Sequence, residues 1–164
     1  MTNIILICLA ILISLIDIFI LLKIVVLDHN DWSYSYLANE LFMSPSEVHA
    51  GVKRASSARL IDINQKQPIK SSLIEFLVHG IKYSFPPDHG SITRGLPTSY
   101  AGPPLNQKFS FSDKEIPVWP DPQGEIRGYA FSPLYKSAPM AAKKDSRLYE
   151  FLVLVDAIRD GRAR

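Results

Sequence analysis

The sequence predicts a mainly α-helical protein whose first half carries two short helices joined by a tight turn. Three observations predict this class. Apolar residues recur at helical spacing in the first half, a serine–proline corner follows the first short helix, and an amphipathic stretch closes the chain. The 164 residues are 47% hydrophobic and 21% charged, which is typical of a folded protein. With a net charge of only +2, any surface for nucleic acid must be local.

We expect the chain to divide into three parts. Residues 1–15 form an apolar N-terminal extension, and residues 16–70 form a helix-turn-helix domain. Residues 71–164 supply a helix, an ordered region rich in proline, glycine and aromatic residues, and a C-terminal helix packed on it. A single cysteine excludes an internal disulfide and a cysteine-based zinc cluster, and the four histidines lack the spacing of metal ligands.

The N-terminal apolar run has two interpretations. Residues 4–22 are long enough to cross a bilayer, which would make the protein an inner-membrane-anchored regulator with a cytoplasmic domain. Asp17 inside such a span would cost roughly 2.5–3.5 kcal/mol. We favour a cytoplasmic protein in which residues 16–27 form a helix that is apolar on all sides and buried in a small domain. Asp17 and Lys23 then lie toward opposite ends of the helix, as its macrodipole favours.

The first of the two short helices follows the break at residues 28–32. Ser33 is a suitable N-cap, and Leu37, Ala38 and Leu41 share one face at helical spacing. The chain then needs only a few residues to reach the next helix start. This spacing predicts a tight helix–helix corner.

The second helix is predicted over residues 45–58. Ser44 caps it, Pro45 suits its first position, and Glu47 completes a capping box. Its inward stripe is apolar, whereas its outer face carries short polar groups first and cations later. Such a face is typical of a recognition helix, although a solvated surface is the plain alternative. Gly51 indicates close backbone approach, either to a neighbouring helix or to DNA.

The segment "SARLIDINQKQPIK" predicts a reduced wing. Leu60 and Ile61 start a short strand and a polar turn follows at residues 64–68, with no clear second strand. Its cations are candidates for phosphate contacts. The complete set of residues expected to contact DNA is Ser44, Ser46, His49, Ala50, Lys53, Arg54, Arg59, Lys66 and Lys70.

The stretch "YLANELFMSPSEVHAGVKRASSARLID" resembles the winged helix-turn-helix domains of MarR-like and related bacterial regulators. With "IEFLVHGIKYSFPPDHGSITRGLPTSYAGPPL" and "VWPDPQGEIRGYAFSPLY", the resemblance extends over residues 16–160 to an uncharacterised branch of bacterial helix-turn-helix proteins. It implies a winged helix-turn-helix fold and a transcriptional regulator. We expect a repressor that binds double-stranded DNA as a homodimer, because such proteins usually bind two half-sites.

The second half begins with a helix predicted from residue 71 to about residue 85. Residues 86–122 carry eight of the twelve prolines, so we expect neither regular helix nor central strand there. Aromatic residues at high density nevertheless indicate an ordered loop. A last amphipathic helix begins near Asp145 and is expected either to close the core or to dimerise.

No arrangement of side chains predicts an enzyme. The segment "HGSITRGLPTSYAGPPL" places His89 and Ser99 in one region, without the third group and oxyanion site that nucleophilic catalysis needs. We therefore expect no catalytic residues, cofactor or metal. The main alternative to DNA binding is a winged-helix protein-interaction module, an antitoxin-like adaptor that uses the aromatic, proline-rich region to hold a protein partner.

Overall fold

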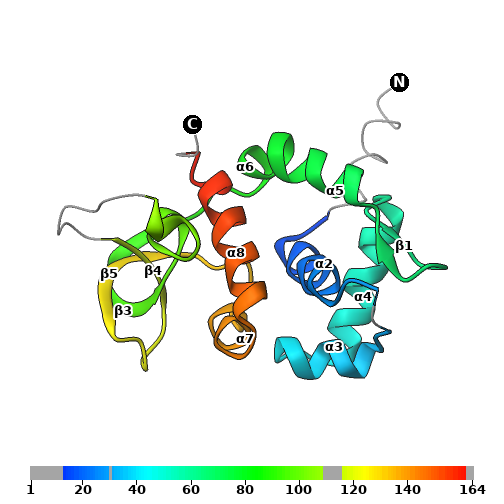
Figure 1. Cartoon of the computed structure of the whole chain (residues 1–164), viewed down its shortest axis with the longest axis horizontal. Coiled ribbons are helices and arrows are strands. Elements are labelled where there is room, and N and C mark those ends of the chain that lie inside the picture. Colours follow the sequence, from blue (N-terminus) through cyan, green and yellow to red (C-terminus); the bar gives the residue numbers. More distant parts are fainter. Residues whose placement is uncertain (1–12, 30, 109–115, 162–164) are drawn as a thin grey trace, which may run out of the picture. The chain divides into compact units, whose positions relative to one another are not determined.

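The computed structural model describes residues 13–29, 31–108 and 116–161, which are mainly helical with two small sheets (Figure 1). The chain forms two compact units, Met1–Leu73 and Ile74–Arg164. The division lies close to the boundary expected at residue 70. The mainly α class is confirmed at this level.

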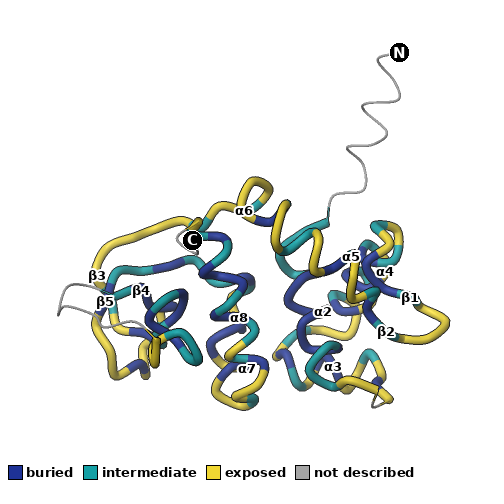
Figure 2. The backbone as a smooth tube through the Cα atoms, turned by 45° about the horizontal axis from the view of Figure 1, so that its top comes forward, coloured by how far each residue is buried: buried dark blue, intermediate teal, exposed yellow. Residues whose placement is uncertain are grey.

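The centre of the first unit is α2 (Leu15–Leu27), which is buried over most of its length (Figure 2). This confirms the buried helix predicted for residues 16–27. Among the described residues, no helix is both long and apolar enough to cross a membrane. Residues 1–12, which hold most of the expected extension and the first part of the candidate span 4–22, lie outside the described residues.

Both charged side chains of α2 are buried and paired within the first unit. Lys23 Nζ lies 2.8 Å from Glu40 Oε2 of the next helix, and Asp17 pairs with Arg54. Burying a charge without a partner is costly, so these pairs permit a polar residue at two positions of an otherwise apolar helix. They also tie α2 to both helices that follow it.

The two predicted short helices are present as α3 (Tyr34–Leu41) and α4 (Pro45–Ser57). Ser33 caps the first helix by accepting a hydrogen bond from Tyr36 N. Ser44 Oγ accepts from Glu47 N at 3.2 Å, and Glu47 Oε2 accepts from Ser44 N at 3.0 Å, so the predicted capping box is confirmed. The helix ends one residue before the predicted end at residue 58.

A two-stranded antiparallel hairpin follows α4. Its strands are β1 (Ile61–Asp62) and β2 (Gln67–Pro68), with Ile61 opposite Pro68. The expectation that no second strand exists was therefore wrong. A two-residue strand that contains proline gives no alternation of apolar and polar residues, which is why the pattern concealed it.

A helical run leads from the first unit into the second. It consists of α5 (Lys70–Glu75), a π-helical turn (Phe76–Gly80) and α6 (Ile81–Ser84). This agrees with the helix predicted from residue 71 to about residue 85. Ile81 is its fully buried member in the second unit.

The second unit contains a small closed barrel of three strands: β3 (His89–Pro97), β4 (Ile116–Pro120) and β5 (Ile126–Phe131) (Figure 1). Strand β3 pairs antiparallel with both others, and β4 and β5 pair in parallel. Two short 3₁₀ turns, Ser99–Ala101 and Leu105–Gln107, follow β3. The region is ordered as expected, but the expectation of loop without central strand was wrong.

Glycine explains why so proline-rich a region can close a sheet. A Cβ atom on Gly95 would lie 2.0 Å from the carbonyl oxygen of Trp119, and one on Gly128 would lie 2.0 Å from that of Ile116. Both glycines therefore permit a strand–strand approach that no other residue allows. Pro97 and Pro120 stand at strand ends, where a missing N–H costs little.

The barrel unit is completed by α7 (Ala138–Lys144) and α8 (Ser146–Arg159). Asp145 caps α8 by accepting hydrogen bonds from Arg147 N and Leu148 N, as its predicted start required. Helix α7 was not predicted. The amphipathic description of α8 was incomplete, because Asp156 and Arg159 are buried rather than exposed.

A buried polar network joins α8 to the barrel. Asp156 Oδ2 accepts hydrogen bonds from Thr98 Oγ1 at 2.8 Å and Trp119 Nε1 at 2.7 Å. Its Oδ1 accepts from Arg159 Nη1 at 2.7 Å, and Arg159 Nε donates to the Phe85 carbonyl. Burial raises the pKa of Asp156 to about 6, against the opposing effect of the Arg159 guanidinium.

Candidate nucleic-acid interface

The outer face of α4 presents a strip of polar side chains to solvent. Ser46, His49 and Lys53 are exposed at spacings of three and four residues, so they lie along one side of the helix. Ala50 is half-buried between them. Ser44 is exposed at the N-cap, but its hydroxyl is engaged with Glu47. The strip combines short groups near the helix start with a cation two turns later.

The Arg54 side chain packs inside the first unit and is also partly exposed to solvent. Its Nε lies 3.0 Å from Asp17 Oδ2 and its Nη2 lies 2.5 Å from Asp17 Oδ1. Asp17 is fully buried, and the hydrogen bond to its side chain raises the pKa of Arg54. A forked contact of this kind fixes the guanidinium strongly. Arg54 therefore anchors α4 on α2, and no local pattern in the sequence indicated its partner 37 residues away.

Gly51 also allows α4 to pack closely on α2. A Cβ atom there would lie 2.5 Å from Ile20 Cδ1 and 3.1 Å from Asp17 Oδ1. The close approach anticipated at this glycine is thus made to α2. Glycine and the ion pair together set the distance between the two helices, and thereby hold the outer strip of α4 in place.

Side-chain hydrogen bonds fix the hairpin to the segment between α2 and α3. Trp32 Nε1 donates to the Lys66 carbonyl at 2.9 Å, and Gln67 Nε2 donates to the Asp28 carbonyl at 2.7 Å. Lys70 Nζ adds a long contact of 3.6 Å to Asp28 Oδ1. These bonds fix the hairpin with respect to the helix–turn–helix. Trp32 and Asp28 were not among the expected functional residues.

The three cations expected from this segment all remain exposed. Arg59 follows α4 with a positive φ of 56°, and Lys66 lies in the hairpin turn with φ of 53°. The Lys66 ammonium lies 5.8 Å from the centre of the Trp32 ring and 3.4 Å from the Trp32 carbonyl oxygen. The first unit therefore gathers Lys53 on α4 with Arg59, Lys66 and Lys70 on the following segment.

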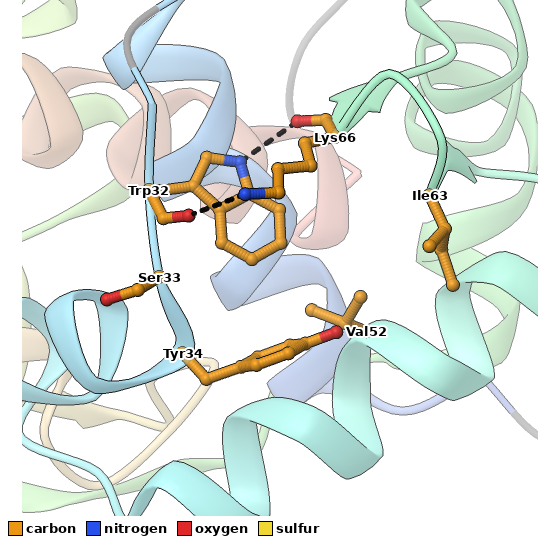
Figure 3. Close-up of a pocket in the computed structure, with 6 residues that line it drawn as sticks. All are labelled: Trp32, Ser33, Tyr34, Val52, Ile63 and Lys66. Atoms are coloured by element: carbon orange, nitrogen blue, oxygen red, sulfur yellow. Dashed lines mark hydrogen bonds between the residues drawn. The ribbon is translucent and has the colours of Figure 1, made fainter.

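A pocket of about 200 Å³ opens between the start of α3, α4 and the hairpin (Figure 3). The side chain of His49 lies beside it, because its ring centre is 5.0 Å from that of Tyr34 in an edge-on arrangement. The residues lining the pocket are Trp32, Ser33, Tyr34, Val52, Ile63 and Lys66.

The segment of residues 89–105 does not bring a nucleophile and a base together. His89 begins β3 and pairs with Asp160 at 3.0 Å, whereas Ser99 is fully buried beyond the other end of that strand. The whole of β3 therefore lies between them in the chain. Arg94, in the same segment, is exposed on β3 opposite Arg127.

Comparison of the chain with protein-family models, with curated proteins and with solved structures gives no match.

Proposed function

We propose that the protein binds double-stranded DNA as a winged helix-turn-helix regulator and represses transcription by occupying a promoter. The observation that carries the proposal is the exposed strip on α4 beside a hairpin that is fixed to the same unit. A short helix, a tight corner, a capped second helix and a hairpin follow in the order of a winged helix. This order supports the resemblance to MarR-like regulators, and a protein of this kind works in the cytoplasm.

Under this proposal the exposed groups have different tasks. The N-terminal part of α4 enters the major groove, where His49 and Ala50 approach base edges and Ser46 approaches the backbone. Lys53, two turns along, and Lys66, on the hairpin turn, contact phosphates on either side of the groove. Arg54 contributes chiefly by holding α4 in place, since its guanidinium is engaged with Asp17.

A homodimer would place two copies of α4 in successive major grooves. Helix-turn-helix proteins usually contact half-sites about one DNA turn apart, roughly 34–36 Å. We therefore expect a site with two-fold symmetry. The two half-sites would also double the number of phosphate contacts and steepen the salt dependence.

The test starts from fragments of genomic DNA selected by the full chain at low salt. In a gel-shift assay, Lys53→Ala and Lys66→Ala should each weaken retention of the selected fragment. They should weaken retention of unrelated DNA to the same extent, since both lysines are proposed to contact phosphates. Lys82→Ala is the matched control, because Lys82 is an exposed lysine of the second unit that lies over Tyr83. Failure to select any fragment, or equal retention by all three variants, would contradict the proposal.

A second function, a protein-interaction module, is favoured by a different observation. Ile74, Val78 and Tyr83 lie on the helical run of the second unit with exposed fractions of 59%, 46% and 77%. Exposed apolar side chains of this size favour a protein partner. Trp119 and Phe131, by contrast, are buried and offer no contact surface. A stoichiometric complex lost on Val78→Ser, in a protein without DNA affinity, would favour this function.

A further inference from the structure

We propose that the face of the barrel formed by β3 and β5 binds single-stranded nucleic acid. Arg94 of β3 and Arg127 of β5 lie directly opposite each other on these antiparallel strands, and both are exposed. Their side chains therefore project side by side from one face of the sheet. This site lies in the second unit, and its binding does not depend on duplex binding by the first unit.

The opposed arginines indicate an anionic ligand. Like charges on directly opposite residues of two strands repel each other and lower the stability of the sheet. Within the part of the chain that the structure describes, neither arginine has an ion-pair partner, although Glu125 is exposed two residues before Arg127. Guanidinium groups bind phosphate and carboxylate groups through forked hydrogen bonds. A bound anion would therefore offset the repulsion between Arg94 and Arg127.

The neighbouring side chains favour a nucleic acid over an acidic peptide. Ile92 is two residues from Arg94 and so shares its side of the sheet, where it lies opposite Tyr129 and is 41% exposed. The ring centre of His89 lies 5.4 Å from that of Tyr129, and the His89 side chain is also 41% exposed. Exposed rings and apolar groups beside cations allow bases to stack while phosphates pair with the cations. An acidic peptide would leave this apolar surface uncovered.

Contacts with the end of α8 hold the ring of His89 in place. His89 Nε2 lies 3.0 Å from Oδ1 of Asp160, whose side chain is only 4% exposed. Phe131, opposite His89, is fully buried, and the Arg159 guanidinium lies 5.7 Å from the centre of its ring. Strand β5 is thus covered at its end and exposed at its start, whereas β3 is exposed over most of its length (Figure 2). The open part of the face extends from His89 to the arginine pair.

The position of this surface on a sheet favours a single strand over a duplex. The bases of a duplex are paired and stacked on one another, so they cannot lie flat against Ile92 or the His89 ring. Unpaired bases can be splayed out and stacked on such side chains. The phosphates between them would then contact Arg94 and Arg127. RNA and DNA strands both offer this chemistry.

Binding is measured by fluorescence anisotropy of labelled oligo(dT) and oligo(rU) with the full chain at low salt. Strands of about 16 nucleotides match the upper size of the site on a small nucleic-acid-binding barrel. Saturable binding of either strand is expected, and the tighter of the two identifies DNA or RNA as the ligand. An acidic peptide of equal charge and the duplex form of the DNA strand are the competitors. Neither should displace the bound strand from the barrel face.

Arg94→Gln and Arg127→Gln should each weaken binding up to about fivefold, the upper value for an exposed ion pair. Together they should make the salt dependence shallower by about 1.4, because each phosphate contact on a single strand contributes about 0.7 to the slope. Arg147→Gln is the matched control, since Arg147 is an exposed arginine on α8 of the same unit, and it should change neither quantity.

Two further measurements separate this inference from a structural role and from the proposed function. The double arginine variant should unfold at the same urea concentration as the parent protein or at a higher one, since a repulsion is removed. Lys53→Ala should weaken retention of the selected duplex and leave oligo(dT) binding unchanged, whereas the double arginine variant should do the opposite. No saturable binding of either strand, or an unchanged affinity and slope in the double variant, would overturn the inference. Equal binding of the acidic peptide, or a lowered urea midpoint, would also overturn it.

Discussion

Truncation of Arg54 distinguishes its packing role from a contact with DNA. In Arg54→Ala, the fully buried Asp17 carboxylate keeps, among the described residues, only the hydrogen bond from Ser14 N at 2.8 Å. Breaking a buried ion pair by removing one partner typically costs about 3–5 kcal/mol. Because the Arg54 side chain is 38% exposed, water can replace part of the contact, and we expect a loss of about 2–3 kcal/mol.

The assay is urea denaturation followed by far-ultraviolet circular dichroism. Arg54→Ala should lower the midpoint without changing the slope, which indicates lost stability rather than a changed unfolded state. Arg54→Lys is the matched control: it keeps the charge but loses the forked contact, so its loss should be intermediate. Asp17→Ala with Arg54→Ala should be less destabilised than the sum of the single variants.

If Arg54→Ala unfolds at the same urea concentration as the parent protein while losing DNA retention, the Asp17 contact does not hold α4 in place. Arg54 would then be a DNA contact in its own right, as the outer-face pattern of the sequence suggested.

Three further predictions concern packing and pH. Gly51→Ala should lower the free energy of unfolding by about 1–2 kcal/mol, and urea denaturation measures it. The new Cβ meets both the fully buried Ile20 side chain and the Asp17 carboxylate that Arg54 holds, and this crowding exceeds the roughly 1 kcal/mol gain in helix propensity. Gly128→Ala should cost at least about 3 kcal/mol, since its new Cβ meets the rigid carbonyl of Ile116; a normal midpoint would contradict the closed barrel. The pKa of Asp156 is raised in the folded state to about 6 from about 3.9 when unfolded. The protonated carboxyl therefore contributes to the free energy of unfolding below pH 4, and this contribution is lost as pH rises through 6. The free energy of unfolding should fall by up to about 3 kcal/mol more over that range than in Asp156→Asn, and parallel pH profiles would contradict it.

Local signals predicted the helix–turn–helix because they act over short distances. The Ser44–Glu47 capping box lies within one turn, and the continuous apolar run from residue 16 to residue 27 indicates burial without knowledge of a partner. Asp17, a charge in a buried helix, requires a cation, yet its sequence position does not say which one.

The barrel and the pocket depend on contacts between distant residues. Gly95 lies in the proline-rich region that was expected to be loop, but it is needed where β3 meets the Trp119 carbonyl. The high density of proline and glycine indicated a loop, because both residues disfavour strands. The sequence pattern does not show where two strands must approach so closely that glycine is required. Trp32 likewise gained its role only when the hairpin folded back to its indole N–H.

The central claim is tested most directly by the salt dependence of binding to the selected fragment, measured by fluorescence anisotropy with the full chain and with Lys53→Ala. If α4 and the hairpin contact phosphates, the logarithm of the association constant falls linearly with the logarithm of salt concentration, and the slope becomes shallower by about 0.9 for each Lys53 removed. Equal slopes for the two proteins, or binding that does not respond to salt, would contradict the account.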